Sequence, residues 1–151
     1  MTDSLKPLWQ EHADILQLKN VAQKVWQELT TKKPFALLLL GDLGAGKTAL
    51  TREILYHAGL SPQRPVNSPT YTLANEYKID QDIYVHLDLY RISEQDLAFA
   101  DDLLNFDSPI SGLFIEWPKS AFFATNLIKR THQMVIETHQ DKRYYSLSLF
   151  N

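Results

Sequence analysis

The chain contains no cysteine, so it can form neither a disulfide framework nor a thiolate metal site. No segment approaches the ~20 consecutive apolar residues that a transmembrane helix needs. Residues 1–7 lack the apolar core of a secretory signal peptide, and the chain shows neither an internal repeat nor a low-complexity linker. These absences predict a cytoplasmic protein without a membrane segment.

The chain also has no excess of basic residues, since its formal net charge is −3. A protein that binds nucleic acid by itself needs a basic surface to neutralise phosphates. This composition therefore argues against a nucleic-acid-binding protein of that kind. What is present is a chain of 151 residues with 44% hydrophobic residues, enough for a real core. We therefore predict a single domain over residues 1–151.

Residues 41–48 read GDLGAGKT, which fits the phosphate-binding pattern G-x-x-x-x-G-K-T. An unbroken apolar run, Phe35–Leu40, leads into them, and a helical pattern runs from Gly46 to about Ala58 and stops at Gly59. In such a loop the glycines let backbone N–H groups turn toward phosphate oxygens, and the start of the helix adds a positive dipole end. The strand, loop and helix together predict a nucleotide phosphate site.

Two side chains of this loop have expected roles in that site. Lys47 can reach the β- and γ-phosphates, and the Thr48 hydroxyl can ligate Mg²⁺. The alternative is a glycine-rich turn with an incidental lysine.

The rest of the sequence predicts an α/β fold, with a P-loop NTPase-like sheet of mixed parallel and antiparallel strands flanked by helices. Besides the strand and helix around the P-loop, we expect helices over about 13–29 and, capped by Ser93, over 94–104, and strands over 71–79, 83–89, 112–115, 134–138 and 144–150.

A P-loop enzyme needs a further acidic group near Mg²⁺, and two candidates stand out. Glu116 follows the apolar run 112–115, which places it at the carboxyl end of a buried strand, where ligands bind in open α/β sheets. Asp88 lies on a strand whose residues alternate strictly, with His86, Asp88 and Tyr90 on one face. We favour Glu116 as the metal-side carboxylate. Asp88 would then support the metal ligands from outside, or orient or deprotonate the attacking water. The alternatives are a surface turn acid for Glu116 and an exposed strand acid paired with Arg91 for Asp88.

Three other features of the sequence bear on the site. Residues 67–70 read NSPT, in the place where many nucleotide hydrolases keep a switch threonine, so Thr70 can sense the γ-phosphate or the water shell of the metal. An ordinary turn is the alternative. Trp117 can stack on a base or simply pack. The five histidines show no metal-ligand spacing and are interpreted as structural.

Four motifs follow one another along the chain: GDLGAGKT at 41–48, SPTYTL at 68–73, HLDLYR at 86–91 and EWP at 116–118. In this order they resemble the TsaE (YjeE) family of small bacterial P-loop ATPases. The resemblance implies a role in the biosynthesis of threonylcarbamoyladenosine, the tRNA modification beside the anticodon. It implies TsaD, which transfers the threonylcarbamoyl group, and TsaB as partners, with tRNA involved only indirectly. ATP hydrolysis would then support turnover rather than drive the transfer chemistry.

The same resemblance implies roles for individual residues. Lys47 contacts phosphate, Thr48 and Glu116 lie at Mg²⁺, and Thr70 and Asp88 are required near the γ-phosphate, which makes Asp88, Thr70 and Lys47 the expected catalytic residues. The residues expected to bind the nucleotide are Asp42, Leu43, Gly44, Ala45, Gly46, Lys47, Thr48, Ala49 and Trp117. The chain departs from the family at Lys119, where another acid is usual, and at 98–102, which contain no glycine.

Other classes of protein fit the sequence less well. A small-molecule kinase would need an acceptor pocket and usually an arginine-bearing lid. The one obvious extension here is the hairpin after the P-loop helix, which has one arginine, Arg91, at its end. A GTPase would need an N-K-x-D segment, which is absent. A binding module that uses ATP only structurally is the third alternative. Because the motifs include no obvious arginine finger, we expect slow hydrolysis by the isolated chain and stimulation by a partner.

Overall fold

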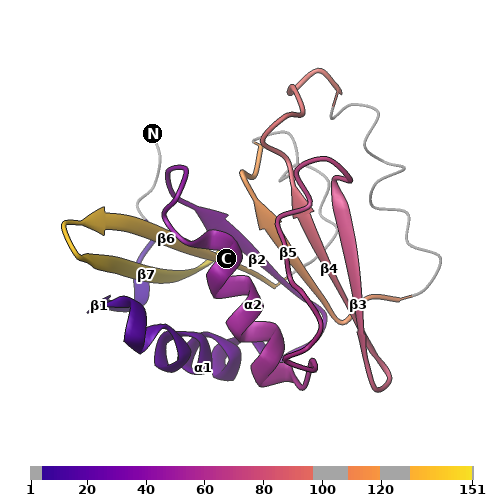
Figure 1. Cartoon of the computed structure of the whole chain (residues 1–151), viewed down its shortest axis with the longest axis horizontal. Coiled ribbons are helices and arrows are strands. Elements are labelled where there is room, and N and C mark those ends of the chain that lie inside the picture. The colour runs from indigo at the N-terminus through magenta and orange to yellow at the C-terminus, as the bar shows by residue number, and fades with distance from the viewer. Residues whose placement is uncertain (1–4, 97–108, 120–129, 151) are drawn as a thin grey trace.

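The computed structural model describes residues 5–96, 109–119 and 130–150, and these residues form one seven-stranded sheet with helices on one face (Figure 1). Across the sheet the strand order is β1-β7-β6-β2-β5-β4-β3. The strands are β1 (Pro7–Ala13), β2 (Phe35–Leu40), β3 (Ala74–Ile79), β4 (Asp82–Asp88), β5 (Gly112–Glu116), β6 (Thr131–His139) and β7 (Lys142–Phe150). The helices are the short 3₁₀ helix η1 (Ile15–Gln17), α1 (Leu18–Leu29) and α2 (Lys47–Ala58).

The centre of the sheet is parallel and its flanks are antiparallel. β2 pairs in parallel with β5 and β6, and β4 pairs in parallel with β5, whereas β3, β7 and β1 add antiparallel neighbours at the sides. The predicted mixed α/β sheet is therefore confirmed. Since parallel strands end at the same edge, the register places Leu39 and Asp88 on either side of Glu116. This edge is where β2 leads into the P-loop.

Helices α1 and α2 pack side by side on the same face of the sheet (Figure 1). Their apolar residues recur at the three- and four-residue spacing of a helix, so they gather on one side. The apolar residues that the two helices bury are Leu18, Val21, Ala22, Val25 and Leu29 from α1 and Leu50, Ile54 and Leu55 from α2. They pack on the sheet side of Phe35, Leu37 and Leu39, while Ala36 and Leu38 belong to a second apolar cluster on the opposite side. β2 is thus apolar on both faces, as its sequence predicts.

The predicted helix over 13–29 is wrong at its start. Ala13 ends β1, and Asp14 caps η1 by accepting hydrogen bonds from the backbone N–H groups of Leu16 (2.8 Å) and Gln17 (3.1 Å). Ile15, an apolar residue within the predicted helix, is 75% exposed. β1 escaped prediction because it is an edge strand of mixed polarity, and its partner β7 lies at the other end of the chain.

Two smaller differences and one untested prediction concern element ends. The strand expected from residue 71 begins at Ala74, because residues 71–73 form a turn. The last hairpin is longer than predicted, with β6 and β7 covering 131–139 and 142–150. Of the helix expected over 94–104, residues 97–104 lie outside the described residues. At its start, Ser93 Oγ accepts a hydrogen bond from the Asp96 N–H at 3.1 Å.

Candidate nucleotide-binding and active site

The P-loop connects the carboxyl end of β2 to the first residue of α2. Gly44 and Gly46 have positive φ angles, 80° and 103°, which L side chains rarely adopt, and Gly46 is the N-cap of the helix. Gly41 is glycine for a different reason, since a Cβ there would lie 2.7 Å from the Ile136 carbonyl oxygen. The loop is therefore pressed against β6 at its start and turned by glycines toward the end of α2 that carries unpaired N–H groups.

Lys47 is the buried cation of this loop, with 5% of its surface exposed. Its Nζ donates to the carbonyl oxygens of Gly41 (2.6 Å) and Asp42 (2.9 Å) and lies 4.2 Å from the centroid of the Trp117 ring. Burial lowers the pKa of Lys47, and the negative charge of Glu116 opposes that effect. The ammonium group thus rests on the carbonyls of its own loop.

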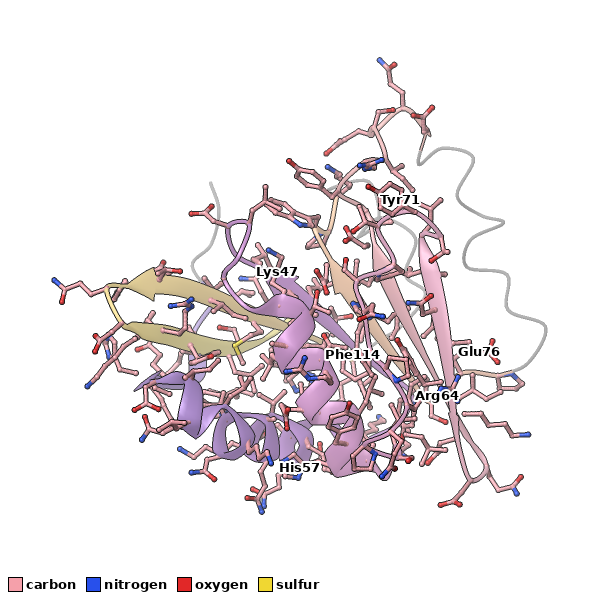
Figure 2. The ribbon with its side chains drawn as sticks, viewed as in Figure 1. Lys47, His57, Arg64, Tyr71, Glu76 and Phe114 are labelled. Atoms are coloured by element: carbon pink, nitrogen blue, oxygen red, sulfur yellow. The ribbon has the colours of Figure 1, made fainter. Side chains whose placement is uncertain are left out.

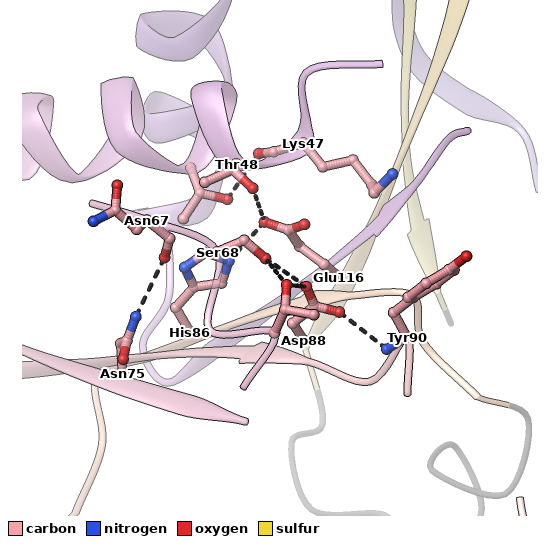
Figure 3. Close-up of polar contacts among 11 residues, drawn as sticks. Lys47, Thr48, Asn67, Ser68, Asn75, His86, Asp88, Tyr90 and Glu116 are labelled. Atoms are coloured by element: carbon pink, nitrogen blue, oxygen red, sulfur yellow. Dashed lines mark hydrogen bonds and ion pairs between the residues drawn. The ribbon is translucent and has the colours of Figure 1, made fainter. Parts of the chain in front are cut away.

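A hydroxyl and a carboxylate meet beside Lys47 (Figure 3). Thr48 Oγ1 donates to Glu116 Oε1 at 2.7 Å, and His86 Nε2 lies 2.8 Å from the same oxygen. Only 3% of Glu116 is exposed, so the alternative of a surface turn acid is wrong. Sequence reasoning placed His86 beside Asp88 on one strand face but did not foresee its contact with Glu116.

The Thr48 hydroxyl and the Glu116 carboxylate are ligand types that suit Mg²⁺ better than zinc. Within the described ranges, no group of three or more His, Cys, Asp or Glu side chains could hold a metal ion. Mg²⁺ is usually held by one or two protein oxygens and completes its shell with phosphates and waters. Thr48 and Glu116 are the residues that could supply those protein oxygens.

Asp88 holds the segment that contains Thr70 (Figure 3). Asp88 Oδ2 accepts hydrogen bonds from Ser68 Oγ and, at 3.0 Å, from Thr70 Oγ1, while Oδ1 accepts from the Tyr90 N–H at 3.0 Å. Asp88 is 3% exposed, so it is not the exposed strand acid of the alternative interpretation. Arg91, its expected partner there, instead stacks on Tyr71 at 4.4 Å. Ser68 is a functional candidate that the analysis of the sequence left out, although it lies in the same NSPT segment.

The loop that carries Ser68 and Thr70 is anchored at its beginning. Arg64 Nη2 donates to the Glu76 carbonyl oxygen at 3.0 Å, and its guanidinium group lies 5.3 Å from the centroid of the Tyr77 ring. Figure 2 shows Arg64 and Glu76 close together at β3, well away from Lys47. The anchor fixes the loop to the sheet, so the two hydroxyls meet Asp88 in a defined position.

Trp117 packs over Lys47. Its ring also lies 4.9 Å from the ring of Tyr90, and its φ angle of 53° is unusual for a residue other than glycine. The ring thus packs against Lys47 and Tyr90, and its role in binding the nucleotide stays a prediction.

A cavity of about 290 Å³ lies next to the P-loop. Its walls include Ile15 and Leu18 from the N-terminal region, Ala45 and Ala49 from the loop and α2, and Arg143 and Tyr145 from β7. Arg143 Nε donates to the Ala45 carbonyl oxygen at 3.2 Å, which ties the last hairpin to the loop. The sequence offered no local signal for this wall, because β7 follows the P-loop by about a hundred residues.

A glycine-turned loop between a central parallel strand and a helix, with a lysine inside it and a hydroxyl–carboxylate pair beside it, defines a P-loop nucleotide-binding protein. Comparison with models of known protein families identifies one family. The profile described as threonylcarbamoyl adenosine biosynthesis protein TsaE matches residues 12–145. The chain belongs to the TsaE family.

Individual relatives agree with this assignment. The tRNA threonylcarbamoyladenosine biosynthesis protein TsaE of Haemophilus influenzae is 38% identical over 118 residues, which are 76% of this chain and 72% of that protein. The Synechocystis protein of the same name is 32% identical over 105 residues, 66% of each chain. The crystal structure of Bacillus subtilis YdiB superposes with a TM-score of 0.66 at 25% identity and covers 99% of this chain and 90% of that one. Of the helices that the structure describes, none is long and apolar enough to cross a membrane.

Proposed function

We propose that the chain binds ATP with Mg²⁺ and hydrolyses it in support of tRNA threonylcarbamoyladenosine biosynthesis. One observation carries the proposal: Thr48 Oγ1 lies 2.7 Å from Glu116 Oε1, at the same sheet edge where Asp88 gathers two hydroxyl groups. In this arrangement Thr48 and Glu116 would bind the metal ion, and Asp88 would position a water for attack on the γ-phosphate. Membership of the TsaE family supports the cellular role.

The P-loop would bind the phosphates of the nucleotide, and the neighbouring cavity would bind its base. The phosphate oxygens would accept hydrogen bonds from the backbone N–H groups of the loop. Lys47 would then donate to a phosphate instead of to the carbonyl oxygens of Gly41 and Asp42. The base would enter the neighbouring cavity, where Ile15 offers apolar surface and Arg143 a charged donor.

Thr48 and Glu116 would hold Mg²⁺, because they supply hard oxygen atoms from two different elements. When bound, Mg²⁺ neutralises the negative charge that develops on the phosphate oxygens during transfer. Lys47 provides a second positive charge on the same phosphates. The protein thus stabilises charge from fixed positions.

Thr70 and Asp88 would place the attacking water. Asp88 Oδ2 already accepts two hydroxyl hydrogen bonds, so it sets the orientation of Thr70 before a water arrives. By exchanging one of these hydroxyls for the water, Asp88 would align it with the γ-phosphate and accept its proton. This step needs no movement of β4, which is buried within the sheet.

Hydrolysis by the isolated chain is expected to be slow. Two arginines near the loop of Ser68 and Thr70 have other contacts, Arg64 with Glu76 and Arg91 with Tyr71. Partner proteins can supply or order the missing positive charge, which is worth about 10³–10⁵ in rate in related chemistry. We propose TsaB and TsaD homologues as these partners in the cytoplasm, with tRNA involved only indirectly.

Two substitutions test the catalytic proposal. Glu116→Ala and Asp88→Ala should both abolish release of inorganic phosphate, while Lys47-dependent ATP binding persists at least in part. His57→Asn, at the far end of α2, is the control and should keep normal turnover. Unchanged turnover in both site variants would overturn the assignment, and transfer of phosphate to a small acceptor instead of water would indicate a kinase. Co-purification with TsaB and TsaD homologues in the presence of ATP tests the partners.

A further inference from the structure

His86 is a polar side chain buried in the sheet. It belongs to β4, the strand between β3 and β5 (Figure 1). None of its surface is exposed. Burying an imidazole costs free energy unless its nitrogen atoms find partners. In the part of the chain that the structure describes, Nδ1 has no hydrogen-bond partner, and Nε2 has one, Glu116. An apolar side chain at this position would cost less free energy to bury. What the imidazole provides, and an apolar side chain would not, is the contact with Glu116.

The geometry of that contact fixes the carboxylate. A carboxylate oxygen accepts, so Nε2 carries the proton and donates to Glu116 Oε1 at 2.8 Å. Thr48 Oγ1 donates to the same oxygen at 2.7 Å (Figure 3). Oε1 therefore receives two donors, one from β4 and one from α2, whereas no described residue donates to Oε2. Among the described residues, this second oxygen is therefore available to a ligand.

We propose that His86 is a positioning residue, which holds Glu116 so that its second carboxylate oxygen faces the metal ion at Thr48. This inference rests on the Mg²⁺–ATP site of the proposed function. The parallel register supports it, because His86 pairs with Phe114, two residues before Glu116 on the adjacent strand. The ring thus reaches the carboxylate from a neighbouring buried strand, without a flexible segment between them. Metal-ligating carboxylates are commonly oriented by such outer hydrogen bonds, whose removal costs about 10–100-fold in metal affinity.

Two isopolar substitutions separate positioning from packing. In His86→Gln the amide nitrogen reaches about as far as Nε2, whereas in His86→Asn it reaches only as far as Nδ1. The experiment measures ATP affinity by titration calorimetry in EDTA and in Mg²⁺ for the wild type and both variants. In EDTA all three should agree within about threefold, because the P-loop binds the phosphates. The gain in affinity on adding Mg²⁺ should fall about tenfold or more in His86→Asn and largely return in His86→Gln.

A full Mg²⁺ gain in a folded His86→Asn variant would overturn the proposal, as would equal losses in both variants. Failure of the proposed function looks different, because the wild type itself would then bind ATP without any dependence on Mg²⁺. If a variant does not fold, ¹⁵N-histidine NMR of the nucleotide-free protein tests the hydrogen bond directly. The proposal requires a proton on Nε2 of His86 and a change of that resonance in Glu116→Ala. A proton on Nδ1 alone would overturn it.

Discussion

Lys47 Nζ lies 4.2 Å from the centroid of the Trp117 ring, which also lies against Tyr90. If Lys47 leaves this position for a phosphate, the indole loses a nearby charge. We therefore expect ATP to change the fluorescence of Trp117. Trp117→Phe should abolish the change although Trp9 and Trp26 remain. Calorimetric ATP binding without any change in wild-type emission would contradict this expectation.

The hydroxyl groups on Asp88 should matter for turnover more than for binding. Thr70→Val keeps the shape of the side chain but removes the donor to Asp88 Oδ2. We expect phosphate release to slow by about 10²-fold, the scale of a misplaced general base, with ATP affinity unchanged. Ser68→Ala should slow it as well, and Thr70→Ser should restore much of the rate.

A neighbouring threonine provides the matched control for that experiment. Thr72 lies in the same loop, but its hydroxyl donates to Asn75 rather than to Asp88. Thr72→Val should therefore leave single-turnover phosphate release near the wild-type rate. Equal slowing in Thr72→Val and Thr70→Val would assign the effect to the loop and not to the contact with Asp88.

Arg143 should contribute to nucleotide affinity through the cavity beside the P-loop. Arg143→Met keeps the aliphatic stem but removes the donor to the Ala45 carbonyl oxygen, 3.2 Å away. In the proposed complex the guanidinium group is also a charged donor for the base. Losing such a donor costs about 1.5 kcal/mol, so the dissociation constant for ATP should rise about tenfold. Affinity for inorganic triphosphate, which lacks a base, should change less. Arg52→Met on α2 is the control, and equal effects of the two substitutions would refute a local role for Arg143.

His132 should make the fold sensitive to acid. Its ring is fully buried, and burial lowers its pKa from 6.5 to about 4, with the charge of Arg130 acting in the same direction. The unfolded chain therefore binds this proton more readily. The stability associated with neutral His132 is present above pH 6.5 and is lost as the pH falls toward 4, on the order of 3 kcal/mol in all. Urea unfolding of His132→Leu should show a weaker dependence on pH over this range, and a curve parallel to that of the wild type would contradict the assignment.

Gly112 marks a close contact inside the sheet. A Cβ at this position would lie 2.4 Å from Cζ of Phe35 on the adjacent strand. Gly112→Ala should lower the free energy of unfolding by about 1–3 kcal/mol, as overpacked substitutions do. Phe35→Leu in the same chain should recover part of the loss, which urea unfolding of both single variants and the double variant would measure as a coupling energy. Strict additivity would exclude the clash as the cause.

The sequence predicted well where the signal was local. The strand Phe35–Leu40, the P-loop and α2 form one continuous segment with its own periodicity and glycine pattern, and the structure confirms all three. The end of β5 was equally clear, because four buried residues precede Glu116. The roles of these residues in binding and catalysis stay predictions until a ligand is tested.

The parts that the sequence did not predict depend on contacts between distant segments. β1 follows from its pairing with β7, and the contact between His86 and Glu116 follows from the parallel register of β4 and β5. Neither register leaves a pattern within one stretch of chain. Ser68 is an intermediate case, since its segment was identified but its bond to Asp88 was not.

The contact between Arg143 and Ala45 also bears on synthesis of the protein. The two residues are 98 positions apart, so the ribosome releases the P-loop long before it releases β7. Until β7 is synthesised, the nascent chain would have the P-loop without one wall of the neighbouring cavity. β1 would also lack its partner strand, which is β7. Nucleotide could then help to stabilise the fold only late in translation, because ligand binding stabilises only the state that contains the finished site.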